Sequence, residues 1–371
     1  MRGNPVRPIV IAAGGTGGHF FPAEALASAL IARGNRIVLM TDARSGSLAS
    51  PIFAGRESFT VRGAGVAGRG TARAAMAGLS LAAGVVQARK ILGRLDAAAI
   101  VGFGGYPSVA PILAARLLGR RPALILHEQN AVLGRANRFL ARACDVLALS
   151  IEATRKVPAG TKSIVTGNPI RPAIAELAQG NYLPPLDEIE LLVLGGSLGA
   201  RVFSDVIPPA IAALPAGLRA RLRIVQQCRA EDIDRVRTGY LTMAVSATIE
   251  TFFTDIEKRL ACAHLVIARA GASTIFEIAA AGKPSILVPL PGAIDDHQSA
   301  NAAALAANGA ALVMAQQSFT AASLTRILER HLQDSSGLCA AAAAARTHGR
   351  ADAAASLADL VEAHIFQDAA K

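Results

Sequence analysis

Short apolar runs rich in β-branched residues recur along the chain, and each is followed by glycine or polar residues and then by a stretch with helical spacing. In the first half these runs occupy residues 8–13, 36–40, 98–101, 123–126 and 146–149. Such continuous runs are typical of strands that are buried on both faces of a parallel sheet and connected by helices. The first half is therefore predicted to form a doubly wound parallel sheet.

The same pattern restarts in the second half, which ends in an alanine-rich stretch predicted to be helical. Its apolar runs occupy residues 190–194, 222–225, 265–267, 285–288 and 311–313. A proline-rich linker is predicted at 166–185. We predict an α/β protein with two Rossmann-like domains that face a central cleft, where ligands bind at the carboxyl ends of the strands. The expected domains are 1–169 and 170–350, with a helix at 351–371 that packs back toward the first.

The composition indicates a globular protein with an anionic partner. Hydrophobic residues make up 52% of the 371 residues, and the formal net charge is +11. This surplus suggests phosphate, nucleic acid or anionic lipid as a partner. Aromatic residues are only 4% of the chain, which argues against a nucleic-acid binder that stacks bases. The scattered cysteines are expected to be reduced thiols of a cytosolic protein, and the interrupted apolar runs predict peripheral membrane contact at most.

The first apolar run leads into a loop with four glycines, Gly14-Gly15-Thr16-Gly17-Gly18-His19. The backbone N–H groups of such a loop can approach a phosphate or a sugar, although a tight turn alone would also use glycine. His19 follows directly, and an imidazole can accept a proton from a hydroxyl near neutral pH. A structural hydrogen bond is the alternative explanation for this histidine.

Two segments of the second half place glycine and hydroxyl groups at predicted helix starts. The segment 195–201 offers N–H groups, a serine hydroxyl and an arginine to a pyrophosphate. In the segment 268–277, the carboxylate of Glu277 can accept hydrogen bonds from two vicinal hydroxyls, such as those of a ribose. A capping box made by Ser273 or Thr274 with Glu277 would explain the same residues without a ligand.

Three further segments follow predicted strands and are expected to line the same cleft. They are residues 102–108, 127–130 and 295–301. The acids and carboxamides of the last segment suit sugar hydroxyls, and a solvated helix start is the alternative.

A stretch between Arg62 and Leu95, with Arg116, Arg120 and Arg121 further on, combines basic and apolar residues. An apolar patch ringed by cations fits docking on an anionic membrane surface. An ordinary amphipathic helix with solvated arginines would have the same composition.

Six segments together resemble the MurG family, the glycosyltransferases of peptidoglycan synthesis that transfer N-acetylglucosamine from UDP-N-acetylglucosamine (UDP-GlcNAc) to lipid I and form lipid II. They are residues 14–19, 102–108, 127–130, 166–171, 195–201 and 271–277. The resemblance implies the GT-B fold, inversion at the anomeric carbon, no essential metal, and a peripheral position at the cytoplasmic face of the membrane. It implies that the first domain faces the acceptor and the membrane, and that the second binds the donor. We expect no cofactor and no nucleic-acid partner.

The resemblance also implies roles for single residues. His19 matches the suggested general base, and we add Glu128 as a second catalytic candidate. The residues that match substrate-binding positions are Thr16, Gly17, Gly18, Asn130, Arg171, Ser197, Phe253, Ala272, Ser273, Thr274, Ile275, Phe276, Glu277 and Gln298. Within this set, Ser197 and the segment 272–277 match contacts to the diphosphate and ribose. Phe253 matches a backbone contact to uracil, and Gln298 matches a contact to the sugar hydroxyls.

The sequence fits three other functions less well. A nicotinamide-dependent oxidoreductase would use Asp42 after the second run, but the glycine spacing and the absence of a Tyr-Lys pair argue against it. A basic scaffold that binds anions without turnover has no need of two glycine loops. Another GT-B UDP-sugar transferase or a UDP-GlcNAc 2-epimerase is the remaining alternative. Asp232 and Asp234 are interpreted as part of a surface helix rather than as a metal site.

Overall fold

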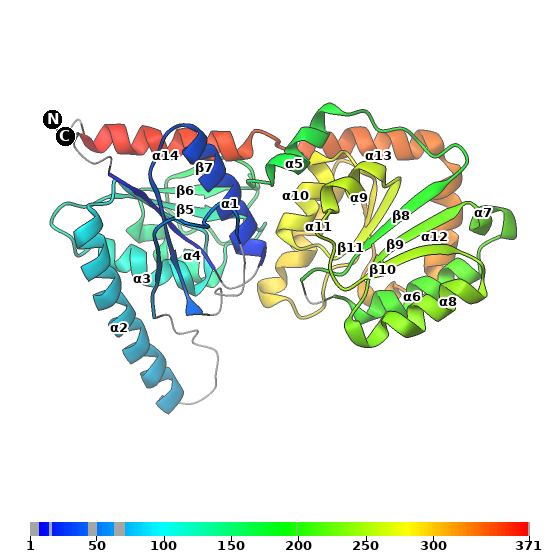
Figure 1. Cartoon of the computed structure of the whole chain (residues 1–371), viewed down its shortest axis with the longest axis horizontal. Helices are drawn as coiled ribbons and strands as arrows, with labels where there is room; N and C mark the ends of the chain where they lie inside the picture. The colour runs from blue at the N-terminus through cyan, green and yellow to red at the C-terminus, as the bar shows by residue number, and fades with distance from the viewer. Residues whose placement is uncertain (1–6, 15–16, 44–49, 63–70, 198, 370–371) are drawn as a thin grey trace. The chain divides into compact units, whose positions relative to one another are not determined.

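The chain forms two compact units. The computed structural model describes residues 7–14, 17–43, 50–62, 71–197 and 199–369. The first unit consists of residues 1–171 and 352–371, and the second of residues 172–351 (Figure 1). The change from one unit to the other at Arg171 lies within the segment predicted as a linker.

The first unit is built on a seven-stranded parallel sheet with the order β3-β2-β1-β4-β5-β6-β7. Its strands are β1 (Ile9–Ala12), β2 (Ile37–Thr41), β3 (Ser58–Thr60), β4 (Ala99–Gly102), β5 (Ala123–Glu128), β6 (Val146–Leu149) and β7 (Ser163–Val165). Its α-helices are α1 (Gly17–Ala32), α2 (Thr71–Leu95), α3 (Gly105–Ala115), α4 (Arg135–Leu140) and α14 (Ala353–Ala369).

Helices cover both faces of this sheet. Leu26 of α1 and Val361 of α14 pack with one face of β1 in a single buried cluster. Leu92 of α2 and Ile112 of α3 pack with the opposite face. Each such side chain contributes about 1.5–3 kcal/mol to the stability of the fold when it leaves water. Because both faces of the central strands are buried in this way, these strands have continuous apolar runs.

The second unit is built on a six-stranded parallel sheet with the order β10-β9-β8-β11-β12-β13. Its strands are β8 (Ile189–Leu194), β9 (Leu222–Gln227), β10 (Ser246–Glu250), β11 (Leu265–Ala268), β12 (Ser285–Leu287) and β13 (Ala311–Val313). Its α-helices are α5 (Pro172–Ala175), α6 (Arg201–Ala212), α7 (Ala216–Ala220), α8 (Ile233–Thr242), α9 (Ile256–Cys262), α10 (Ala272–Ala280), α11 (His297–Ala306), α12 (Ala321–Gln333) and α13 (Ser335–His348). The prediction of two Rossmann-like parallel sheets is confirmed.

Three strands were not predicted from the sequence, and all three lie at sheet edges. All residues of β7 are exposed, and β3 and β10 are exposed at most positions. An edge strand has one neighbour and little cover, so its sequence needs no apolar run.

The C-terminal helix α14 returns to the first unit and packs on α1, β4 and β5. Arg33, directly after α1, pairs with Asp359 at 2.7 Å and with Glu362 at 2.8 Å. In the part of the chain that the structure describes, no helix combines the length and the apolar character needed to cross a bilayer.

Candidate functional site

In the first unit, the loops that follow β1 and β4 begin at the same level of the sheet. Ala12 and Gly102, the last residues of these strands, are paired in the register. The connections that follow β1 and β4 leave toward opposite sides of the sheet. Parallel α/β sheets bind ligands at the point where two such connections diverge. The Ser108 Oγ lies 3.0 Å from the carbonyl oxygens of both Ala12 and Gly104, so this side chain links the two loops.

His19 lies at this edge, in the first turn of α1. Its Nδ1 is 2.8 Å from the carbonyl oxygen of Phe103, which can only accept a hydrogen bond. The proton is therefore assigned to Nδ1, and Nε2 carries the lone pair that a general base requires. Gly104 and Gly105 have φ values of +82° and +66°, and a Cβ at Gly104 would lie 3.5 Å from the His19 ring. Glycine at these positions therefore lets the loop run close to the imidazole.

The His19 Nδ1 has a second contact, with the side-chain amide of Gln129, and the orientation of that amide also has to be assigned. Gln129 Nε2 lies 2.7 Å from Nδ1, although two N–H donors cannot bond to each other. Gln129 Oε1 is buried and has no partner among the described residues. Turning the Gln129 amide over lets its oxygen accept from Nδ1, which removes the conflict between the two donors.

Glu128, the last residue of β5, is buried and accepts four hydrogen bonds. Its Oε1 accepts from the backbone N–H of Asn130 at 2.9 Å and from the Asn130 side chain at 3.0 Å. Its Oε2 accepts from the Gly134 N–H at 2.8 Å and from the Asn137 side chain at 3.0 Å. The carboxylate thus holds the loop that leads into α4. These contacts favour a positioning role for Glu128 over the catalytic role expected from the sequence.

The neighbouring His127 is fully buried. Its Nε2 donates to the carbonyl oxygen of Gly167 at 3.1 Å, and its ring packs against Phe103 with centroids 5.2 Å apart. Burial lowers the pKa of His127 to about 4, so the ring is neutral near pH 7. His127 Nδ1 and both side-chain polar atoms of the buried Asn168 have no partner among the described residues. Ordered water is the usual partner of such groups.

The other expected residues of the first unit lie in three places. Gly17 and Gly18 begin α1, and Thr16 lies outside the described residues. Asn130 is fixed by Glu128. The Arg171 guanidinium lies 5.0 Å from the centre of the Phe21 ring in α1.

The second unit repeats this arrangement at β8 and β11, whose last residues Leu194 and Ala268 are paired in the register. The loop after β8 is tight, because a Cβ at Gly195 would lie 2.4 Å from the Ala200 nitrogen. Ser197 is exposed in this loop. Within the described residues no side chain caps the start of α6. Its first N–H groups are therefore available to an anion.

Gln227, the last residue of β9, hydrogen-bonds to this loop through its side chain. Its Oε1 accepts from the Gly195 N–H at 3.0 Å. Its Nε2 donates to the carbonyl oxygens of Gly196 at 3.0 Å and Thr251 at 3.1 Å. One buried amide thus joins the loops after β8 and β10. Phe253, in the second loop, is buried and stacks with Arg259 at 5.5 Å.

Helix α10 begins without the capping box that the sequence allowed. Its N-cap is Gly271, with no side-chain cap among the described residues. Ala272, Ser273 and Thr274 form the first turn, so Glu277 lies in the second turn, where its carboxylate is buried. Ile275 and Phe276 face the core. The capping explanation of Ser273, Thr274 and Glu277 is therefore wrong.

Arg269 and Asn301 hold this part of the second unit in place. Both lie in segments predicted to contact a ligand, 268–277 and 295–301, but this structural role was not predicted from the sequence. Arg269 is buried and donates to the carbonyl oxygens of Val288 at 3.0 Å and Pro289 at 3.2 Å, and to Gln316 at 2.6 Å. Asn301 donates to the Ala270 carbonyl at 3.1 Å. An arginine directly after a buried strand was the signal available for Arg269.

Gln298 lies at the start of α11, after the loop that follows β12. Its Oε1 accepts from the Leu290 N–H at 2.9 Å. Asp295 and Asp296 in this loop have φ values of +55° and +53°, so the chain turns sharply before α11. The Gln298 side chain thus ties the two ends of the loop together.

Two parallel sheets of one topology, each with a glycine loop at the point where the strand order reverses, are the architecture of the GT-B fold. Models of the N-terminal and C-terminal domains of glycosyltransferase family 28 match residues 9–148 and 190–357. The UDP-N-acetylglucosamine--N-acetylmuramyl-(pentapeptide) pyrophosphoryl-undecaprenol N-acetylglucosamine transferase of Granulibacter bethesdensis is 58% identical over 96% of this chain and 93% of its own length.

Among solved structures, MurG of Acinetobacter baumannii matches with a TM-score of 0.75 and 29% identity, over 96% of this chain and 99% of that one. A candidate UDP-N-acetylglucosamine 2-epimerase of Listeria monocytogenes matches with a TM-score of 0.67 and 14% identity, over 97% of each chain. That second likeness shows the fold alone. The chain belongs to the MurG family of glycosyltransferases, as the six segments indicated, and it is a hexosyltransferase.

The buried state of His127 predicts a loss of stability in acid. Its pKa rises from about 4 in the folded chain to its ordinary value of 6.5 in the unfolded chain, so the unfolded chain takes up the proton first. The free energy of unfolding therefore falls as the pH drops from 6.5 toward 4, and His127 alone should remove about 2 kcal/mol between pH 7 and pH 5. Urea denaturation at both pH values measures this loss. A His127→Gln variant should lack this part of the loss in free energy of unfolding. Equal pH dependence in both proteins would contradict the lowered pKa of His127.

Proposed function

We propose that this chain transfers N-acetylglucosamine from UDP-GlcNAc to the C4 hydroxyl of the N-acetylmuramoyl unit of lipid I, forming lipid II in peptidoglycan synthesis. The observation that carries the proposal is the 58% identity, over nearly the full length, to a protein with that name. The alternative UDP-GlcNAc 2-epimerase activity is supported only by a shared fold at 14% identity.

The second unit is proposed to bind the donor. The N-terminus of α6, with Ser197, and the N-terminus of α10, with Ser273 and Thr274, offer N–H and hydroxyl donors to the UDP diphosphate. Glu277 accepts from the ribose hydroxyls, the backbone at Phe253 contacts uracil, and Gln298 contacts hydroxyls of the sugar. Ala272, Ile275 and Phe276 complete the helix start that shapes this site.

The first unit is proposed to bind the acceptor and to supply the base. His19 Nε2 takes the proton of the acceptor C4 hydroxyl as its oxygen attacks the anomeric carbon. The bond from that carbon to the diphosphate breaks, and UDP leaves with the electron pair. Attack from the side opposite to the leaving group inverts the configuration. The helix N-termini of the second unit offset the charge that develops on UDP.

Glu128 is proposed to be a positioning residue for the acceptor site. Its four hydrogen bonds fix Asn130 and the start of α4. Asn130 and Arg171, with Thr16, Gly17 and Gly18, are the proposed substrate contacts on this unit.

The proposed activity is tested with UDP-GlcNAc and a water-soluble lipid I analogue, scoring both UDP release and the linkage formed. His19→Gln should lower kcat by about 10²- to 10⁴-fold with little change in the KM for UDP-GlcNAc, because only proton transfer is lost.

Glu277→Ala should raise the KM for UDP-GlcNAc by about ten-fold or more, because a carboxylate acceptor is lost. No transfer by the wild-type chain would overturn the proposed function. Unchanged kinetics in either variant would remove that residue from the site.

We also propose that the chain docks on the anionic cytoplasmic face of the membrane through α2. Met76, Leu79 and Val86 are exposed at 70%, 73% and 57%, and their spacing places them on one face of this helix. Lys90 and Arg94 continue the same face toward the end of α2. An apolar stripe that runs into cations suits an anionic surface. Arg69 and the side chain of Arg73, which also belong to the predicted stretch, lie outside the described part.

Replacing Met76 and Leu79 by serine should lower binding to phosphatidylglycerol vesicles by about ten-fold, because two side chains lose their contact with lipid. Activity on a vesicle-bound acceptor should fall with it, and kcat on the soluble analogue should not. The matched control replaces Leu186 and Leu241 of the second unit, which are exposed at 86% and 70%, by serine. Equal vesicle binding by the two double variants would show that docking does not use α2.

A further inference from the structure

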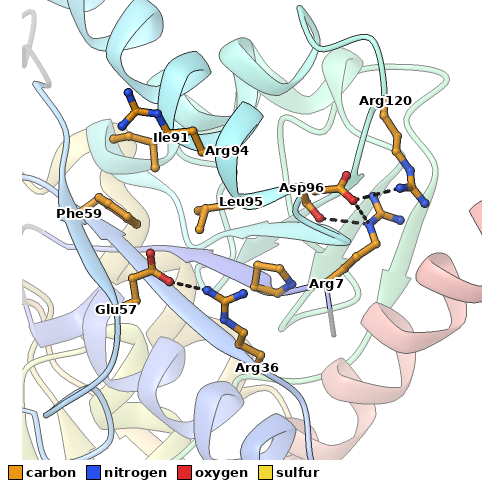
Figure 2. Close-up of a pocket in the computed structure, with 10 residues that line it drawn as sticks. Arg7, Arg36, Glu57, Phe59, Ile91, Arg94, Leu95, Asp96 and Arg120 are labelled. Atoms are coloured by element: carbon orange, nitrogen blue, oxygen red, sulfur yellow. Dashed lines mark hydrogen bonds and ion pairs between the residues drawn. The ribbon is translucent and has the colours of Figure 1, made fainter. Parts of the chain in front are cut away.

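The amino-terminal edge of the first sheet holds a charged cavity of about 570 Å³ whose two carboxylates are already paired (Figure 2). Asp96 pairs with Arg7 at 3.3 Å and with Arg120 at 3.0 Å, and Glu57 pairs with Arg36 at 2.6 Å. Among the described residues, no buried side chain of this lining has a nitrogen or oxygen without a partner. The cavity therefore indicates no further chemistry.

Several buried polar atoms without a partner among the described residues lie at the carboxyl end of β5, which is the opposite edge of the sheet. They are Nδ1 of His127, Oδ1 of Asn137 and one atom of the Gln129 carboxamide. Asn137 donates to the carbonyl oxygen of His127 at 3.0 Å, and Gln129 contacts His19. Gln129 belongs to the segment 127–130 that the sequence predicts to line the site, and its side chain reaches the proposed general base.

His19 is held through Nδ1 by two oxygens. Nδ1 lies 2.8 Å from the carbonyl oxygen of Phe103 and 2.7 Å from the carboxamide of Gln129, whose oxygen faces it once the amide is turned over. One N–H group can be shared between two acceptors in this way. A Cβ at Gly104 would lie 3.5 Å from the ring, and a Cβ at Gly105 would lie 4.0 Å from Nε2. The two acceptors and the adjacent loop therefore fix the rotation of the imidazole and leave Nε2 as its basic nitrogen.

Both acceptors are neutral, which suits a base that has to be unprotonated before the reaction. Their hydrogen bonds strengthen when His19 takes up a proton, because Nδ1 then belongs to a cation. A carboxylate in place of the Gln129 amide would favour the protonated imidazole before any substrate has reacted. The amide therefore assists proton transfer without charging the base beforehand.

Two ionisable side chains at the end of β5 lie near this contact. Glu128 directs its carboxylate oxygens to four donors beyond β5. Burial lowers the pKa of His127 to about 4, so that ring is neutral near pH 7. The loop after β4 presents residues 103–105 to His19, none of which ionises. On α1 itself, the next ionisable residue after His19 is Glu24, more than one turn further on.

We propose that Gln129 is a positioning residue for the general base: its side-chain oxygen holds the Nδ1–H of His19 and thereby directs Nε2 to the acceptor hydroxyl. This role rests on the proposed function, in which Nε2 takes the proton of the C4 hydroxyl. The Nδ1–H stays in place during that transfer. The oxygens of Gln129 and Phe103 then stabilise the positive charge that the ring has acquired.

The kinetic test compares Gln129→Glu and Gln129→Met on the water-soluble lipid I analogue, each alone and combined with His19→Gln. Gln129→Glu should raise the pH below which kcat/KM falls by about one to two units, because a carboxylate at Nδ1 stabilises the protonated ring. Gln129→Met should lower kcat by about ten-fold without changing the KM for UDP-GlcNAc, because the ring loses one of its two acceptors. Neither change should lower the residual activity of His19→Gln any further, because the group on which Gln129 acts is then absent.

Ser150→Ala is the matched control. Its hydroxyl is buried in the same region, but it contacts His127 at 3.3 Å rather than His19. This variant should keep the wild-type kcat and pH profile. A purely structural role of Gln129 would lower stability and activity without moving the pH profile, so the profile separates the two roles.

The contact is also measured without turnover, by NMR titration of protein labelled with ¹⁵N-histidine, with the His19 signals identified by their loss in His19→Gln. The midpoint of the His19 titration should lie about one to two pH units higher in Gln129→Glu than in the wild type, and Ser150→Ala should not move it. An unmoved midpoint in Gln129→Glu overturns the inference. So does an equal loss of activity on adding Gln129→Met to the wild type and to His19→Gln. No transfer by the wild type would overturn the proposed function instead, and the titration would still decide whether Gln129 holds His19.

Discussion

The parallel arrangement of the strands is the constraint on which the rest of the molecule depends. In a parallel sheet all carboxyl ends lie at one edge, and the connections from two adjacent central strands leave toward opposite sides. In each unit these two strands end level, at Ala12 and Gly102 and again at Leu194 and Ala268. The space beyond them is not covered by a crossover, so the loops there can take a shape set by a ligand. The glycine loops and His19 all lie at these two positions.

Buried polar side chains at the ends of strands give these loops their shape. Glu128 at the end of β5 and Gln227 at the end of β9 each bond to two separate stretches of backbone or side chain beyond their own strand. Arg269, just after β11, does the same with three acceptors. Burying such groups is costly unless all their bonds are made, and here the loops supply the partners. Loop geometry and core stability are therefore coupled in both units.

The sequence was sufficient for the central strands because both faces of each are buried, which leaves a continuous apolar run. It was insufficient for the edge strands β3, β7 and β10, whose exposed residues carry no such pattern. The glycine loops and His19 were found because their residue types are unusual at the end of a strand. Gln227 was not found, because a single amide looks like any surface residue until its partners are known. Asn301 was predicted only as part of the segment 295–301 that suits sugar hydroxyls, and its bond to the Ala270 carbonyl was not foreseen. The start of α10 was ambiguous for the same reason, since Ser273 and Thr274 suit both a cap and a first turn.

The most direct test of this account concerns Gln227, which joins the proposed diphosphate loop to the proposed uracil loop. Gln227→Met keeps the approximate shape and removes its hydrogen bonds. Gln226→Met is the matched control, because Gln226 is also buried on the same strand but accepts its bond from Tyr240 at 2.6 Å, away from the loops. Both variants should lose about 1–3 kcal/mol of stability in urea denaturation. The account predicts that only Gln227→Met raises the Kd for UDP in calorimetry, by about ten-fold or more, since the loop is no longer held for the ligand. Equal UDP affinity in the two variants would contradict the claim that this buried amide shapes the donor site.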